Sequence, residues 1–473
     1  MELLRDPSTI DLAQPGERVM LISTPALDVR LPWALWHQPV GLLQLGAALR
    51  ARGCDVRLID CLEPPPNGHL PRERVASLSV EGESIGLWRF GPSPAKVAAC
   101  LRAWRKEGWQ PDRILLSCGI STWWRGASGL IAALKTATQA PVFLGGAYPT
   151  FYPEHAATHA GADAIAVGGV VEAQRAVPDL TLYRPGPLPR FAGILLLAPT
   201  HPAIMAQQPR DPKEVAAEVE TKLALGVTTF ALFDDFLGPE HHEAVADVLR
   251  AISNLGLAKV RFVTVGNVSP RLIDDGLARL LRQARFQQIH LHDDLEFTSR
   301  GIRRLSTDDD YARCVRALHR AGFRLRTEEV GAGVVVGFPG EGLAEVVDRL
   351  VRLASTVGSI NLVPYQYTPG TPEGETFEPW LARHNGHLDP TTLNAQLYPL
   401  ARLSGGTLED YRDLTRLAAL LNSKYRSRTF DFRGDSLAAR LLRASLREEL
   451  WNPFRQPLEP RATHAPVGPM RRR

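Results

Sequence analysis

The sequence predicts an α/β protein in which two regions of alternating strands and helices precede a helical C-terminal region. Three observations support this fold class. Strand-sized apolar runs alternate with helical patterns over the first third of the chain, the alternation restarts after a Pro-rich break, and the pattern becomes helical after Pro372. Strand–helix alternation is typical of parallel sheets. We therefore expect three parts, residues 1–183, 190–375 and 376–473.

The first part is expected to form a doubly wound, Rossmann-like sheet. Its predicted strands are 18–23, 55–60, 113–117, 142–144 and 162–167. Helices are predicted over 40–52, where Gly53 is a good stop residue, and near 128–138. Residues 63–94 are rich in proline and glycine and predict a loop-rich insertion. Ligands of such sheets bind beyond the carboxyl ends of the strands.

The second part begins after the break 184–190, Arg-Pro-Gly-Pro-Leu-Pro-Arg, which is a plausible linker. Its strands are expected near 193–197, 229–233, 261–265, 288–291, 332–337 and 360–364, with helices such as 212–225 and 308–321 between them. This repeat predicts a partial or full TIM-like barrel, whose chemistry lies at the carboxyl ends of its strands. In the third part we expect helices over 390–403, 408–421 and 436–450, and a poorly ordered Pro- and Arg-rich tail over 452–473.

Composition excludes several classes of function. The chain has 473 residues, 44% hydrophobic and 22% charged, with a formal net charge of +4. A small excess over this length favours neither nucleic acid nor a membrane as partner. The five cysteines have no disulfide or zinc spacing, the N-terminus has no apolar signal segment, and the apolar runs are too short to span a bilayer. We expect a cytoplasmic protein.

Motif-like pieces in the first part occur together and in order. They are Pro39–Arg50, Gly53, Val56, Asp60, Pro111–Ser117, Pro141–Gly146, Pro149–Thr150, Pro153–Glu154, Ala162–Gly169 and Glu172. In these pieces the chain resembles the cobalamin-binding domain that precedes many radical S-adenosylmethionine (SAM) domains. The resemblance implies cobalamin contacts from Gly41, Leu42, Ser117, Gly119, Gly145, Gly146, Gly168 and Glu172.

The expected roles follow from size and donor chemistry. Gly145, Gly146 and Gly168 would let the backbone approach the nucleotide tail of the cofactor, and Ser117 could donate a hydrogen bond to it. Some cobalamin domains carry an Asp-x-His-x-x-Gly motif whose histidine ligates cobalt. This motif is missing here, as it usually is in the radical SAM branch, which leaves His37 as a candidate ligand of cobalt and Trp36 as a candidate to pack on the corrin. The alternative is a flavodoxin-like fold in which these glycines only make turns.

The second part resembles the radical SAM barrel. The matching pieces are Gly193–Leu197, Asp211–Glu220, Phe230–Phe236, Gly331–Glu341 and Pro364–Pro372. Where that family carries Cys-x-x-x-Cys-x-x-Cys, this chain has Ala198-Pro199-Thr200-His201-Pro202-Ala203-Ile204-Met205, and no cysteine lies between Cys118 and Cys314. An iron–sulfur cluster needs several thiolates within reach of one another. We therefore expect a degenerate member without a cluster, without reductive cleavage of SAM, and with SAM binding in doubt.

Polar residues gather at the predicted carboxyl ends of the barrel strands. The candidate catalytic residues are His290, His292, Asp294, Asp234, Asp235 and Tyr365. Alternation along a strand is expected to place His290, His292 and Asp294 on one face, where two imidazoles could do acid–base work or bind a divalent metal. For Asp234 and Asp235, a structural role in capping helices and pairing with arginines is an equal alternative.

Three functions remain open at this point. The first is a cobalamin-dependent enzyme that performs non-radical chemistry, such as methyl transfer, on a small organic substrate. The second is a non-catalytic cobalamin-binding sensor, carrier or scaffold that partners a paralogous or pathway protein. The third keeps SAM as an ordinary polar methyl donor without the cluster.

Overall fold

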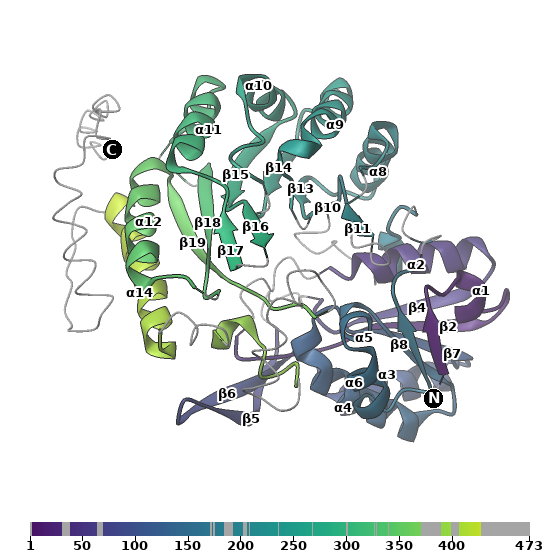
Figure 1. Ribbon diagram of the computed structural model, residues 1–473. Helices are drawn as coiled ribbons and strands as arrows, with labels where there is room; N and C mark the ends of the chain where they lie inside the picture. Colours follow the sequence, from purple (N-terminus) through teal and green to yellow (C-terminus); the bar gives the residue numbers. More distant parts are fainter. Residues whose placement is uncertain are drawn as a thin grey trace, which may run out of the picture.

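The protein is described here by a computed structural model (Figure 1). It describes residues 2–30, 38–63, 70–170, 173, 176–183, 193–201, 206–207, 209–234, 236–266, 268–298, 301–325, 327, 329–338, 340–369, 389–398 and 406–426. The expected helix 436–450 and the tail 452–473 lie outside these residues.

The first part of the chain forms the predicted parallel sheet. Its six strands are β1 (Glu2–Arg5), β2 (Arg18–Ser23), β4 (Asp55–Asp60), β7 (Arg113–Ser117), β8 (Val142–Gly145) and β9 (Ala164–Val167), in the order β1-β9-β8-β7-β2-β4. All five neighbouring pairs are parallel. The chain crosses from one side of β2 to the other between β4 and β7, so the carboxyl end of the β2–β7 pair is the switch point of the sheet.

Helices cover both faces of this sheet. α2 (Val40–Ala51) packs on the face that presents Val19 and Leu21, in one hydrophobic core. α3 (Pro94–Lys106), α4 (Trp124–Ala137), α5 (Ala147–Phe151) and α6 (Pro153–His159) pack on the face that presents Met20 and Ile22. Burial on both faces explains why β2 is a continuous apolar run rather than an alternating one.

The prediction of a loop-rich insertion over 63–94 is wrong for most of its length. β5 (Arg72–Val80) and β6 (Glu83–Phe90) form an antiparallel hairpin, and β6 also pairs with β3 (Ala26–Asp28). The two-residue turn is Glu81-Gly82, with φ of 52° and 82°. Positive φ at both positions matches the right-handed twist of a hairpin, and glutamate is an unusual residue there, which hid the turn.

The second part forms an open, partial barrel of six parallel strands. They are β10 (Gly193–Leu195), β13 (Thr229–Leu232), β14 (Arg261–Thr264), β15 (Phe286–His292), β18 (Val330–Val336) and β19 (Ser359–Pro364), paired in chain order. Helices α8 (Pro212–Ala224), α9 (His242–Asn254), α10 (Asp275–Gln283), α11 (Asp308–Arg320) and α12 (Leu343–Thr356) lie on the outer face (Figure 1). Within the described residues β10 and β19 do not pair with each other.

Side chains hydrogen-bond to backbone groups at both free edges of this sheet. At β10 the Nζ atom of Lys222 donates to the carbonyl oxygen of Ile194 at 2.6 Å, and Arg210 donates to that of Leu196 at 3.1 Å. At β19 the amide of Asn422, on α14 (Leu408–Arg426), both accepts from the N–H and donates to the C=O of Ile360, each at 2.8 Å. Unpaired backbone groups at a sheet edge cost free energy when they are buried, and when exposed they can pair with another chain. These contacts therefore help the barrel to stay open.

The predicted helix 390–403 is absent from residues 389–398, which form turns and a short 3-10 helix at Ala395–Leu397. Asp389 accepts from the backbone N–H of Thr391, and Asn394 accepts from that of Gln396. Such side-chain bonds compete with helix formation. The segment contacts the first part instead, where Asn394 donates to Asp28 at 2.7 Å.

No helix within the described part of the chain is both long and apolar enough to cross a lipid bilayer.

Candidate functional site

The two histidines predicted from the sequence share the interior face of the barrel. On β15, Ile289 and Leu291 are buried in the core beneath the outer helices, and His290 and His292 alternate with them and are half-buried. The register places His290 beside Gly331 and His292 beside Gly333 of β18. The imidazoles therefore lie next to two residues without side chains.

The glycines of β18 leave room for the imidazoles. A Cβ atom on Gly331 would lie 2.6 Å from Ser359 Oγ and 2.9 Å from His290 Cε1. On Gly333 it would lie 3.1 Å from Val363 Cγ2 and 3.4 Å from His292 Cδ2. Approaches under 3.0 Å force a neighbour to move, so a side chain at position 331 would displace the His290 ring or Ser359.

The hydrogen bond of His292 defines which ring nitrogen carries the proton. Its Nδ1 lies 2.9 Å from the carbonyl oxygen of Asp293. Since a carbonyl only accepts, Nδ1 carries the proton of the neutral ring and Nε2 carries the lone pair. The Phe236 ring lies edge-on, 6.3 Å away between centroids. His292 is thus oriented by the backbone as a proton acceptor.

The expected carboxylate partners of the histidines are engaged elsewhere. Asp294 follows the end of β15, so strand alternation does not extend to it, and its place on the histidine face stays a prediction. Its Oδ2 accepts from Arg271 at 2.8 Å, and its N–H donates to Ser306. Asp234 is buried, and its Oδ1 accepts the backbone N–H groups of Leu197 and Ala198 at 2.7 and 2.6 Å. Both carboxylates therefore stabilise loops that follow the barrel strands.

A buried charge network beside the barrel mouth was missed by the sequence reasoning. Asp293 accepts from both Arg304 and Arg349, and Arg304 also donates to Glu341. Glu341 accepts the N–H of Gly337 at 2.7 Å, so it closes the turn of the Gly-Phe-Pro-Gly-Glu segment. Burial raises the pKa of Glu341 to about 7. In the sequence, the one feature that pointed to this network was the Gly-Phe-Pro-Gly-Glu segment, which is part of the match to the radical SAM barrel.

Tyr365, the remaining described candidate, follows β19 and is half-buried, with its ring 6.5 Å from that of Phe338. Four predicted site residues lie outside the described residues, so their roles stay predictions. They are Asp235, Trp36, His37 and Glu172.

A second polar surface lies at the carboxyl edge of the first sheet. Asp60, Ser23, Ser117 and Gly145 end four adjacent strands and are direct register partners, Asp60 to Ser23, Ser23 to Ser117 and Ser117 to Gly145. All four are half-buried. Ser23, Ser117 and Gly145 lie two residues after Leu21, Leu115 and Phe143, and Asp60 lies four residues after Val56. The row, which we call the edge shelf, therefore faces the α2 side.

The predicted cofactor glycines divide into two groups. A Cβ on Gly146 would lie 2.6 Å from the Cys118 carbonyl oxygen, and one on Gly168 would lie 2.1 Å from Asp6 Oδ1. Their φ values are 97° and 89°. The close approach at these two positions is therefore to the chain itself, as the turn alternative expected.

The other predicted cofactor glycines have open space beside them. Gly41 and Gly119 have no atom within 4 Å of a Cβ position, and Gly145 has only Ala166 at 3.7 Å. Leu42, also predicted to contact the cofactor, is buried in the core.

The cysteines lie apart from the barrel mouth. Cys118 belongs to the core on the α3–α6 side of the first sheet, and Cys314 is buried on α11 beneath the barrel. Among the described residues no group of three or more His, Cys, Asp or Glu side chains could hold a metal ion. The segment that replaces the family's cluster motif holds a short hairpin of Thr200–His201 with Ala206–Gln207.

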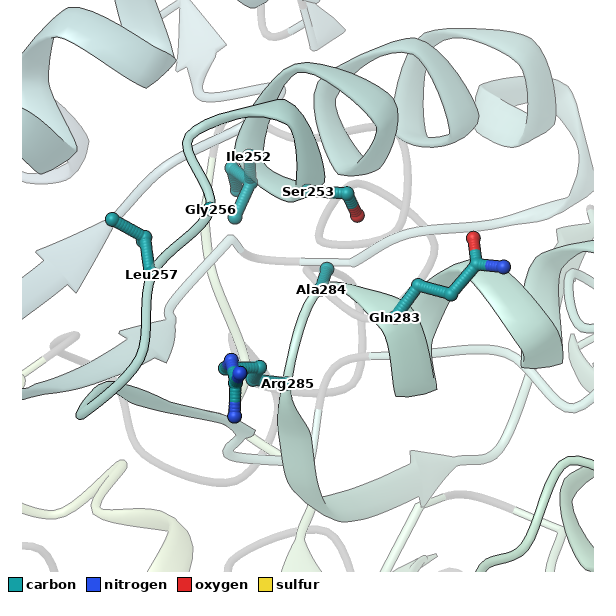
Figure 2. Close-up of a pocket in the computed structure, with 7 residues that line it drawn as sticks. All are labelled: Ile252, Ser253, Gly256, Leu257, Gln283, Ala284 and Arg285. Carbon is teal, nitrogen blue, oxygen red and sulfur yellow. The ribbon is translucent and has the colours of Figure 1, made fainter.

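A small cavity lies away from both surfaces (Figure 2). It has a volume of about 140 Å³ and lies between the C-terminal ends of α9 and α10, with Ser253, Gln283 and Arg285 among its lining residues. In a βα barrel the helices end at the face where strands begin, and chemistry lies at the opposite face. This cavity is therefore no part of the candidate site.

Comparison with solved structures identifies the fold. The radical SAM methyltransferase TsrM from Kitasatospora setae, with cobalamin and a 4Fe–4S cluster bound, aligns with a TM-score of 0.54 and 16% identity over 78% of this chain and 78% of that chain. A second TsrM structure, with its tryptophan substrate and the SAM analogue aza-SAM bound, aligns with a TM-score of 0.56 and 15% identity over 87% and 98%. No family model and no curated protein matches the chain. The chain has the fold of this cobalamin-binding radical SAM methyltransferase.

Proposed function

We propose that the protein binds cobalamin at the edge shelf and catalyses non-radical methyl transfer to a small organic substrate in the barrel mouth. The observation that carries the proposal is the imidazole pair, His290 and His292, on a barrel face that Gly331 and Gly333 keep clear. The fold shared with TsrM supports a cobalamin partner, and the absence of cysteines between Cys118 and Cys314 argues against a cluster.

The groups at and around the edge shelf support a corrinoid ligand. Gly41, Gly119 and Gly145 leave space where side chains would stand, and Ser23 and Ser117 offer hydroxyl groups at the switch point of the sheet. When bound, cobalamin supplies a cobalt centre that carries a methyl group in two-electron chemistry.

The barrel residues supply the proton chemistry. Methylation of an N–H, O–H or C–H group by a methyl cation equivalent forms one bond to the methyl carbon and releases one proton. Nε2 of His292 takes that proton, because Nδ1 is already committed to the Asp293 carbonyl. His290 lies on the same face, two residues before His292, and Ser359 lies beside it across Gly331. Together they orient a polar substrate group.

The engaged carboxylates favour a second candidate, a non-catalytic cobalamin-binding scaffold. Asp234, Asp293, Asp294 and Glu341 are all hydrogen-bonded to backbone N–H groups or arginines. These described carboxylates stabilise the fold. A degenerate barrel that has lost its activity would also retain them. The two candidate functions differ in whether the protein's function depends on His290 and His292.

The first experiment is reconstitution with hydroxocobalamin, followed by desalting and an absorption spectrum. Retained corrin bands without the broad absorption of thiolate-ligated iron support the cofactor assignment, and a colourless protein contradicts it. Demethylation of methylcobalamin is then followed with tryptophan, the substrate bound in TsrM, as the first probe. We expect His292→Ala to abolish it, and His319→Ala, on the outer helix α11, to leave it unchanged.

Retained corrinoid binding with no demethylation by any probe, and no effect of His290→Ala or His292→Ala, supports the scaffold instead. Equilibrium dialysis with SAM separately tests whether SAM binds, which a methyl donor must do.

A further inference from the structure

Asp60 lies at the end of the edge shelf, where three hydrogen bonds hold its carboxyl group. Its Oδ1 accepts the backbone N–H of Leu62 at 3.0 Å, and its Oδ2 accepts the hydroxyl of Tyr183 at 3.1 Å. Ser23, its register partner on β2, also hydrogen-bonds to it. These contacts fix the carboxyl group at the carboxyl edge of β4, where it stays half-buried.

The shelf presents its polar groups in a line. Adjacent strands are about 4.8 Å apart, so Asp60, Ser23 and Ser117 span about 10 Å across β4, β2 and β7. All three side chains leave the sheet on the α2 side. The line crosses the switch point, where ligands of doubly wound sheets bind. A bound molecule that reaches Ser117 at one end can therefore reach Asp60 at the other.

The chemistry of the Asp60 end is selective. A carboxylate has about four acceptor positions, and the three hydrogen bonds of Asp60, from Leu62, Tyr183 and Ser23, leave about one of them for a ligand. Its charge disfavours a phosphate group and favours an N–H or O–H donor. The hydroxyl groups of Ser23 and Ser117 can either donate or accept, so they set no such preference.

We infer that Asp60 is a cofactor-contact residue that accepts a hydrogen bond from an N–H or O–H group of the bound corrinoid. The inference rests on the proposed function and names one contact of the same site. Two parts of cobalamin carry such donors, the carboxamides at the rim of the corrin ring and the ribose of the nucleotide. Cobinamide has the carboxamides but lacks the nucleotide, so it separates these sources.

The test measures corrinoid affinity, by absorption titration and equilibrium dialysis, with hydroxocobalamin and with aquacobinamide. The variants are Asp60→Ala, which removes the acceptor, and Asp60→Asn, which keeps one acceptor oxygen and guards against loss of the fold. The matched control is Asp55→Ala at the opposite end of β4, where the carboxylate accepts from Trp109 Nε1 at 2.7 Å.

We expect Asp60→Ala to weaken cobalamin binding about tenfold or more, Asp60→Asn to weaken it less, and Asp55→Ala to bind like the wild type. An equal loss with cobinamide assigns the donor to the corrin rim, and a loss with cobalamin alone assigns it to the nucleotide. Wild-type affinity in both Asp60 variants overturns this inference alone. A wild-type protein that binds neither corrinoid overturns the proposed cofactor and the inference with it.

Discussion

The Oδ1 atom of Asp234 lies 2.6 Å from the amide nitrogen of Ala198 and accepts its hydrogen bond. The same oxygen accepts the N–H of Leu197 at 2.7 Å. Ala198 opens the segment in which radical SAM relatives carry their cluster cysteines. A buried carboxylate after β13 thus fastens the start of this loop to the barrel, and Asp234 has a structural task that needs no cofactor.

The first prediction concerns this carboxylate. Asp234→Ala leaves two buried N–H groups without this acceptor, and we expect it to lower the free energy of unfolding by about 2–3 kcal/mol in urea titrations. Asp234→Asn retains an acceptor oxygen and is expected to cost about half as much. If Asp234→Ala keeps full stability but loses methyl transfer, the structural assignment is contradicted and the catalytic one gains support.

Much of the fold was predictable because apolar runs and helical patterns alternate clearly. The predicted strands 18–23, 55–60 and 113–117 have the observed bounds. In the first and the third, burial on both faces gives a continuous apolar run. β1, a four-residue edge strand, carries too little pattern to be recognised. The hairpin turn Glu81-Gly82 lacks the usual Asn-Gly or Asp-Gly signal.

The candidate site was predictable only where it depends on local alternation. His290 and His292 follow from the period of β15. Asp293 could not be assigned its partners, because Arg304, Glu341 and Arg349 come from three later elements that only tertiary packing brings together. The Asp60–Ser23–Ser117 row depends on the lateral order β4-β2-β7, which differs from chain order.

The second prediction tests the space around the imidazoles. In Gly331→Ala the new Cβ meets Ser359 Oγ at 2.6 Å and His290 Cε1 at 2.9 Å, so the ring must shift. We expect a stability loss of about 1–3 kcal/mol, together with altered imidazole signals in the NMR spectrum. Gly333→Ala, with nearest contacts of 3.1 and 3.4 Å, is the matched comparison and is expected to cost less. Equal effects from the two variants would contradict the assigned role of Gly331.

The third prediction compares two neighbouring arginines of β17 (Gly301–Arg304). Arg304, with 18% of its side chain exposed, pairs with the buried Asp293 and Glu341, whereas Arg303, 68% exposed, pairs with Glu296. Arg304→Leu leaves two buried carboxylates without this partner, and we expect a loss of about 3–5 kcal/mol. Arg303→Leu removes a solvated pair and is expected to change stability by less than about 1 kcal/mol. The free energy of unfolding of both variants is measured by chemical denaturation. Similar losses of stability in the two variants would argue against a buried network.

The last prediction is a pH dependence that originates at Asp60. Burial raises its pKa in the folded protein from 3.8 to about 6. Between these values the folded state binds more protons than the unfolded state at this residue, so the free energy of unfolding falls as pH rises from about 4 to about 6. Because Asp60 is partly solvated, its contribution stays below about 3 kcal/mol.

The measurement is urea denaturation of the wild type and Asp60→Asn at several pH values from 4 to 7. Other carboxylates titrate in both proteins, so only the difference between the two curves reports on Asp60. We expect the wild type to lose stability relative to Asp60→Asn over this window, and Asp55→Asn to keep the wild-type profile. Parallel curves for the wild type and Asp60→Asn would show that the pKa of Asp60 is the same in the folded and unfolded states, and would contradict the prediction.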